Sequence, residues 1–201
     1  MEPFKRHTGV AVPFDRPDVD TDLIVPARYL KRVDRTGYGQ LLFYSKRYLP
    51  DGAPDPEFVL NRPQYRGGSI LVAGRNFGCG SSREHAVWAL QESGFRAVIA
   101  PTMADIFRSN AIKNGLVPVE LNADAVSRLL AAVQADAKTT ITVDVAKRTV
   151  AAPGLNASFP LADFLQTQLL GGLDEIAVTL RHEPDIAAFE LKRSEWLPRV
   201  R

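Results

Sequence analysis

The stretch GSILVAGRNFGCGSSREHAVWALQESGFRAVIA, residues 68–100, contains the pattern that decides the fold. Residues 69–73 form a short apolar run between glycines, which predicts a buried strand. Residues 84–92 carry apolar side chains at helical spacing, and Gly94 follows them as a helix stop. Residues 96–100 form a second apolar run and predict a second buried strand. Strand, helix and strand in this order indicate an α/β fold.

The segments that follow extend this alternation. We expect helix, strand, helix and hairpin in chain order, at residues 104–114, 116–121, 123–135 and 139–152. Residues 162–172 and the tail from residue 174 are predicted to be helical, whereas the segment before Gly68 is predicted to be irregular. The sequence therefore predicts a single α/β domain over residues 1–201, with one core, an irregular N-terminal third and a helical C-terminal tail.

Composition excludes several classes of protein. Hydrophobic residues make up 45% of the chain and charged residues 24%, which is ordinary for a soluble globular protein. The net charge of +2 comes from mixed charges and argues against a nucleic-acid binder. A single cysteine cannot form an internal disulfide, which fits a reducing cytosol. Since no apolar run has the length of a membrane span, we expect a cytoplasmic protein without a membrane or nucleic-acid partner.

The loop NFGCGSSREHA, residues 76–86, lies between a predicted strand and a predicted helix, where α/β proteins commonly bind ligands. Amides at the start of a helix favour an anion, and Arg83 can hold a carboxylate with two hydrogen bonds. A structural alternative is a capping box, with Ser81 as the N-cap and Glu84 bonding back to it. In a further arrangement, Ser82 caps the helix and Ser81 stays free.

Other functions are less consistent with this loop. Arg83 replaces the third glycine of a dinucleotide fingerprint, and a P-loop lysine is missing. Cys79 would need a base such as His85 to act as a nucleophile, and a lone cysteine is more often a buried apolar residue. The three histidines have no ligand spacing, so we expect no metal site on this chain.

A second segment with functional residue types precedes the first predicted strand. Asp20 and Asp22 stand at i and i+2, so on an extended segment their carboxylates point the same way. They could hold a cation or orient the basic residues that follow, whereas the structural alternative is a solvated Asx turn.

Taken together, the motifs resemble the family of small subunits of bacterial 3-isopropylmalate dehydratase, in the aconitase superfamily. The resemblance covers most of the chain and is weakest over residues 123–162. It rests on a set of segments in the family's order: DVDTDLIVPARYLKR, VDRTGYGQLLF, PDPEFVLNRPQYRGGSILVA, GCGSSREHA, VIAPTMADIFRSNAIKNGLVPVEL and GGLDEIAVTLRHEPDIAAFE.

This resemblance implies a fold and a set of site residues. The fold is the swivelling β/β/α domain of the aconitase type. Ser81 is implied as the catalytic base, and Ser82, Arg83 and Asp22 as substrate-binding residues. The loop over residues 29–38 corresponds to the segment that selects the substrate side chain, with these candidates: Leu30, Lys31, Arg32, Arg35 and Tyr38. A further substrate carboxylate would fall to one of four basic residues that we leave open: Arg28, Lys31, Arg32 and Arg35.

The resemblance also implies a partner. A [4Fe–4S] cluster is held by a separate large subunit, and the pair interconverts 2-isopropylmalate and 3-isopropylmalate in leucine biosynthesis. Such a cluster is normally held by at least three cysteine thiolates, and this chain has one cysteine, so we expect no cofactor on this chain. The alternatives are a small subunit of a citraconate, maleate or homoaconitate-type hydro-lyase, and a non-catalytic dicarboxylate-binding module.

Overall fold

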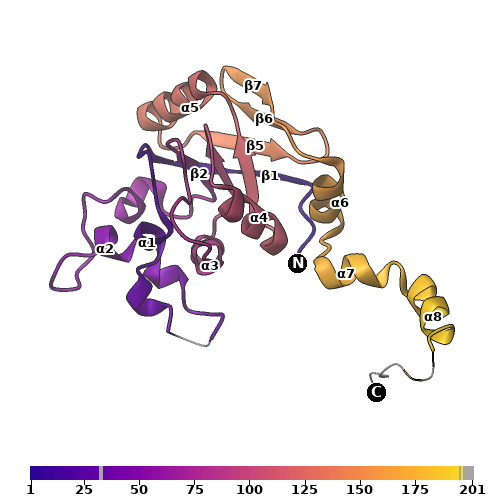
Figure 1. The fold of residues 1–201 in the computed structure, drawn as a ribbon. Helices are drawn as coiled ribbons and strands as arrows, with labels where there is room; N and C mark the ends of the chain where they lie inside the picture. Colours follow the sequence, from indigo (N-terminus) through magenta and orange to yellow (C-terminus); the bar gives the residue numbers. More distant parts are fainter. Residues whose placement is uncertain (32–33, 195, 197–201) are drawn as a thin grey trace.

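A computed structural model of the chain describes residues 1–31, 34–194 and 196. Its centre is one seven-stranded sheet with the order β4-β3-β2-β1-β5-β6-β7 (Figure 1). The strands are β1 (Arg6–Phe14), β2 (Ile70–Ala73), β3 (Ala97–Ala100), β4 (Val117–Glu120), β5 (Thr140–Asp144), β6 (Thr149–Ala152) and β7 (Leu155–Ser158). The helices are α1 (Thr21–Ile24), α2 (Tyr44–Arg47), α3 (His85–Glu92), α4 (Asp105–Asn114), α5 (Ala123–Ala135), α6 (Asp163–Gly171), α7 (Glu175–Leu180) and α8 (Glu183–Leu191).

Strand β1 joins a parallel half of the sheet to an antiparallel half. Residues 11–14 pair in parallel with β2, whereas residues 6–10 pair antiparallel with β5. The expectation of an irregular N-terminal third is therefore wrong for this strand. Its first half is partly exposed and its second half is buried, so the sequence shows neither a clean alternation nor a continuous apolar run.

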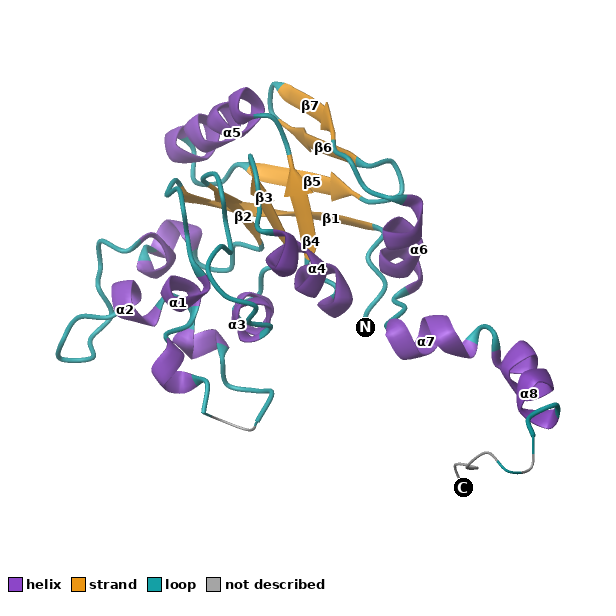
Figure 2. Cartoon of the chain, in the orientation of Figure 1, coloured by secondary structure: helices purple, strands orange, loops and turns teal. Residues whose placement is uncertain are grey.

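The parallel half is covered by helices on both faces. All residues of β2 and β3 are buried, as their continuous apolar runs predict. Figure 2 shows α5 on one side of the sheet and α3 with α4 on the other. Helix α5 starts at Asn122, whose side chain accepts a hydrogen bond from the amide of Ala125 at 2.8 Å. These elements confirm the predicted α/β core.

The antiparallel half contains one strand more than the hairpin that the sequence predicts. β5 and β6 pair as expected, and β7 then pairs with β6. β7 has the sequence LNAS and no fully buried residue, so it lacks the apolar signal of a strand. The turn at Gly154, which has a φ of +71°, reverses the chain and places β7 beside β6.

The remaining N-terminal third packs on the core through short helices and four 3-10 turns. The turns are η1 (Ala27–Tyr29), η2 (Gly39–Leu41), η3 (Val59–Asn61) and η4 (Pro63–Tyr65). The Phe14 and Phe43 rings stack with centroids 4.5 Å apart, which ties this part of the chain to β1.

The C-terminal tail is helical, as predicted, but it does not enter the core. No residue of α7 or α8 is buried, and both helices extend away from the sheet in Figure 1. Lys113 of α4 forms an ion pair with Glu175 at 2.7 Å and holds the start of the tail. Among the helices that the structure describes, none is long and apolar enough to cross a membrane.

Candidate functional site

Three loops meet where β1, β2 and β3 end, at the carboxyl edge of the parallel strands. The loop after β2 lies between the other two. On one side, the Gly78 amide donates to the Val19 carbonyl at 2.7 Å, and the Thr21 amide donates to the Cys79 carbonyl at 2.9 Å. On the other side, two amides of the loop donate to Thr102, one to its hydroxyl at 2.9 Å and one to its carbonyl at 3.1 Å. Backbone bonds therefore fix the position of this loop.

Two glycines in the loop adopt left-handed backbone angles, which glycine reaches without steric cost. Gly78 has a φ of +75° and Gly80 a φ of +94°. A Cβ atom on Gly78 would lie 2.3 Å from Cγ of Phe107 in α4. This glycine is thus required by close packing against a helix, and not by the approach of a ligand.

Ser81 does not cap helix α3. The helix begins at His85, four residues later, and Glu84 occupies the N-cap position without a side-chain cap. The Glu84 carboxylate instead accepts a hydrogen bond from Asn114 Nδ2 at 2.8 Å. The capping-box interpretation is therefore wrong, because the Glu84 side chain bonds to α4 and Ser81 lies four residues before the helix. The expectation that the helix begins near Ser81 or Ser82 is also wrong, since α3 begins at His85.

The Ser81 hydroxyl is held by Thr21, a residue that the sequence analysis did not select. The two hydroxyl oxygens are 3.0 Å apart, and either group can be the donor. Thr21 is only 2% exposed, and its hydroxyl also lies 3.3 Å from the Ser81 carbonyl oxygen. A threonine between two aspartates carries no obvious sequence signal, and only the pairing of the two loops brings it to Ser81.

Arg83 and Asp22 form an ion pair across the same two loops. The Asp22 carboxylate also accepts a hydrogen bond from the Ala27 amide at 3.0 Å. The Arg83 side chain is 24% exposed and that of Asp22 57% exposed, so solvent screens the pair. Such a pair contributes at most about 1 kcal/mol, which leaves Arg83 able to exchange Asp22 for another carboxylate.

Asp20 and Asp22 do not share a site. The Asp20 carboxylate caps α1 by accepting a hydrogen bond from the Leu23 amide at 2.6 Å. The turn interpretation therefore holds for Asp20, whereas the Asp22 carboxylate pairs with Arg83. In the described part of the chain, no three His, Cys, Asp or Glu side chains lie together as metal ligands.

The Cys79 thiol is not set up as a nucleophile. Burial raises its pKa, and the negative charges of Asp20 and Asp18 raise it further. The His85 ring packs against Tyr38 and Trp88, with centroids 5.1 and 4.7 Å away, and burial lowers the pKa of its imidazole. These residues also do not fit an iron–sulfur cluster, since such a cluster needs several cysteine thiolates and Cys79 is the one cysteine of the chain.

Replacing Cys79 with serine is expected to leave most of the activity of the assembled enzyme. Serine has nearly the same size, and the raised pKa of the thiol disfavours the thiolate that a nucleophilic cysteine needs. Steady-state kinetics of Cys79→Ser together with the large subunit would check this. Complete loss of turnover in a variant that still folds would show that the sulfur takes part.

Arg28, Lys31 and Arg35 lie on the surface, in or just before the loop over residues 29–38. Arg28 is exposed, with its guanidinium carbon 4.9 Å from the Tyr29 ring centroid, and the Arg35 guanidinium lies 5.5 Å from the Trp88 ring centroid. Lys31 is exposed, and Arg32 lies outside the described residues. The choice of the residue for a second carboxylate stays open among these four.

The two other residues predicted in this loop are partly or fully buried. Leu30 packs against the hydrophobic core, and Tyr38 is fully buried against His85 and Trp88. This placement of Tyr38 differs from that of a side chain that lines an open substrate site. The ring instead anchors the end of the loop on α3.

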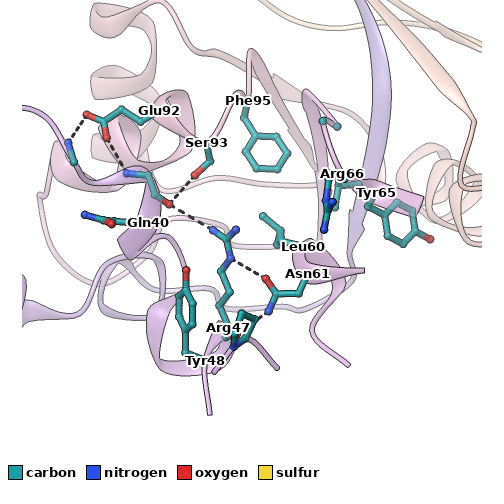
Figure 3. Close-up of a pocket in the computed structure, with 16 residues that line it drawn as sticks. Gln40, Arg47, Tyr48, Leu60, Asn61, Tyr65, Arg66, Glu92, Ser93 and Phe95 are labelled. Carbon is teal, nitrogen blue, oxygen red and sulfur yellow. Dashed lines mark hydrogen bonds between the residues drawn. The ribbon is translucent and has the colours of Figure 1, made fainter. Parts of the chain in front are cut away.

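A cavity of about 830 Å³ lies at the other end of α3 (Figure 3). It is lined by Glu92 and Ser93 at the end of that helix and by Gly68, which precedes β2. Ser81 follows the opposite end of β2 and is exposed at the surface. The predicted site is therefore an open face of the molecule, and this cavity is separate from it.

Comparison with known proteins identifies the family. The aconitase C-terminal domain family matches residues 1–124, and the family of the C-terminal domain of 3-isopropylmalate dehydratase small subunits matches residues 175–200. A 3-isopropylmalate dehydratase small subunit of Rubrobacter xylanophilus is 52% identical over 200 residues, and 100% of each chain is covered. The chain belongs to the family of 3-isopropylmalate dehydratase small subunits.

Further similar proteins support the same family. A 3-isopropylmalate dehydratase small subunit of Parafrankia sp. is 57% identical, with 98% of each chain covered. The crystal structure of a 3-isopropylmalate dehydratase from Methanocaldococcus jannaschii matches with a TM-score of 0.65 and 28% identity, covering 91% of this chain and 98% of that one. The predicted aconitase-type α/β fold of these small subunits is therefore confirmed.

Proposed function

We propose that this chain is the small subunit of a 3-isopropylmalate dehydratase, a hydro-lyase of leucine biosynthesis, and that Ser81 is its catalytic base. The observation that supports this role most directly is the Ser81 hydroxyl itself. It is exposed, it does not cap α3, and its described side-chain partner is the Thr21 hydroxyl. A serine in this position is available to a substrate.

The reaction removes a weakly acidic proton from the carbon next to a substrate carboxylate. A neutral serine is a poor base, so the site has to favour its alkoxide. When the Thr21 hydroxyl is the donor of this pair, its hydrogen bond stabilises negative charge on the Ser81 oxygen and so favours the charged form. Thr21 is in this proposal a positioning residue, since it acts through Ser81.

Arg83 and Ser82 are proposed to bind a substrate carboxylate. In the free chain Arg83 pairs with Asp22, so the substrate carboxylate would replace that carboxylate on the guanidinium. The positive guanidinium of Arg83 next to the substrate carboxylate also stabilises the negative charge that develops on that carboxylate as the proton leaves. Asp22 then keeps its hydrogen bond from the Ala27 amide and holds the loop.

A large subunit is proposed to complete the site. Departure of the substrate hydroxyl needs a Lewis acid, which an iron–sulfur cluster on the partner would supply. The relatives are named as small subunits, which implies such a partner. A cytoplasmic location is part of this proposal, because a chain with one free cysteine suits a reducing compartment.

The first experiment tests the need for two chains. The purified chain is expected to be colourless and inactive, and the addition of the large subunit should restore turnover of 2-isopropylmalate and 3-isopropylmalate. A panel with citraconate, maleate and homoaconitate-type substrates would check the substrate preference. Tight dicarboxylate binding by the isolated chain, without turnover in the mixture, would instead indicate a binding module.

The second experiment concerns the tail, which presents large apolar side chains to solvent. These are Ile176, Leu180, Ile186, Phe189, Leu191 and Trp196. Exposed apolar clusters of this kind are typical of protein interaction surfaces. Replacing Phe189 and Leu191, which are 71% and 88% exposed, with serine is expected to weaken association with the large subunit at least about tenfold while the chain still folds.

Analytical ultracentrifugation of the mixed subunits would measure that loss. The control is Leu49→Ser, because Leu49 is also exposed but lies in the N-terminal third. Unchanged affinity of the tail variant would show that the large subunit binds elsewhere.

A further inference from the structure

The cavity of about 830 Å³ at the far end of α3 has the size of a small-molecule site. Two arginines line it, Arg47 at the end of α2 and Arg66 just before β2 (Figure 3). Apolar side chains line it too, among them Leu60 and Phe95. The cavity therefore combines positive charge with apolar surface.

Arg47 is held in one orientation by its neighbours. Its Nε donates to Oδ1 of Asn61 at 3.0 Å, and one terminal nitrogen lies 3.5 Å from the Gly39 carbonyl oxygen. Asn61 is itself fixed, because its amide group donates to the carbonyls of Arg47 at 2.7 Å and Asp55 at 2.9 Å. An arginine that is ordered before a ligand arrives loses little side-chain entropy on binding.

The two arginines of this cavity outnumber the one acid that lines it. Glu92 is the one carboxylate among the lining residues, and its two oxygens accept hydrogen bonds from the Gly37 and Gly39 amides at 3.1 and 2.8 Å. Within the described ranges, no carboxylate forms an ion pair with Arg47 or Arg66. No carboxylate in these ranges therefore competes with an anion for either guanidinium group.

We propose that this cavity is a second binding site, separate from the Ser81 site, for a small organic anion with a carboxylate or phosphate group and an apolar body. The charged group binds to Arg47 and Arg66, and the body lies against Leu60 and Phe95. This proposal does not depend on the proposed function, because it concerns binding alone.

The cavity is linked to the end of the loop over residues 29–38 by hydrogen bonds of Gly39. The Gly39 carbonyl accepts from Arg47 and from the Ser93 hydroxyl, at 3.5 and 3.0 Å, and its amide bonds to Glu92. The neighbouring Tyr38 ring packs against Trp88 with centroids 5.8 Å apart. An anion that bonds to Arg47 competes with the weak 3.5 Å contact of Arg47 to the Gly39 carbonyl, so the surroundings of the Trp88 indole should change.

Titration calorimetry of the full chain with inorganic phosphate, succinate and hexanoate tests the site. Hexanoate combines a carboxylate with an apolar body, succinate has two carboxylates, and phosphate has no body. We expect saturable binding of at least one organic probe at one site per chain, with phosphate binding more weakly. In a Trp196→Phe background, Trp88 is the one remaining tryptophan, and its fluorescence should change with the same dissociation constant.

Two charge variants and one control complete the experiment. Arg66→Gln removes a side chain without described hydrogen-bond or ion-pair partners, so the fold should persist and affinity should fall at least about tenfold. Arg47→Gln should have the same effect on affinity, and Lys46→Gln is the matched control, because Lys46 is an exposed neighbour that does not line the cavity. Absence of saturable binding by every probe, or binding that Arg66→Gln leaves unchanged, would overturn the proposal.

Discussion

Replacing Ser81 with alanine is expected to lower the turnover number of the assembled enzyme by at least about 10²-fold, the usual contribution of a catalytic base. The substitution removes the one oxygen that can accept the substrate proton at this position. Stability should change little, because the side chain is exposed and does not cap α3. Steady-state kinetics with the large subunit and thermal unfolding of the free chain would measure the two effects.

Two further variants separate the catalytic role from a structural one. Ser45→Ala is the matched control, since Ser45 is an exposed serine of α2 outside the candidate site, and it should retain full activity. Thr21→Val removes the hydroxyl that bonds to Ser81 and should lower the turnover number while KM changes less. A Ser81→Ala variant that keeps its turnover but unfolds at a lower temperature would contradict the proposed base and make Ser81 a structural residue.

Replacing Arg83 with lysine is expected to lower kcat/KM by about 10- to 100-fold. Loss of a charge-assisted hydrogen bond costs about 1.5–3 kcal/mol, and an ammonium group cannot bind a carboxylate with two parallel hydrogen bonds. The fold should persist, because the ion pair of Arg83 with Asp22 is partly exposed to solvent. The measurement is the kinetics of the assembled enzyme with both isomers of the substrate.

The matched control for Arg83 lies in the same loop. Arg75 also forms a partly exposed ion pair, with Asp18 at 3.4 Å, and Arg75→Lys should leave kcat/KM unchanged. Equal kinetics of Arg83→Lys and the wild-type chain would remove Arg83 from the carboxylate site. An equal loss in both variants would instead indicate that the loop, and not one guanidinium group, determines the activity.

The parallel half of the sheet was predictable because burial on both faces leaves a direct sequence signal. β2, β3 and β4 are short apolar runs, and the helices between them end at Gly94 and Gly115. β1 was missed because its first half is partly exposed and its second half is buried, so it follows neither the strand alternation nor the continuous run. β7 was missed because its alternation spans four residues and none of them is buried. Position in the sheet, and not local propensity, makes these two segments strands.

In the candidate site, too, residues close together in the chain were predictable and contacts between distant residues were not. The loop with Ser81, Ser82 and Arg83 is recognisable from its residue types and spacing. Its neighbours are not, because Thr21 and Asp22 are about 60 positions away in the chain. The capping box was a reasonable local prediction that failed because the Glu84 carboxylate bonds to Asn114 at the end of α4, and α3 begins only at His85.

The sequence by itself determined the alternation of apolar runs and helices, the helix stop at Gly94 and the residue types of the reactive loop. These properties depend on side chains close together in the chain. The tertiary structure alone decided that β1 joins the two halves of the sheet, that Ser81 faces Thr21, and that Arg83 pairs with Asp22. Such contacts form when the sheet brings the ends of separate strands to one edge, and no local pattern encodes which strands become neighbours.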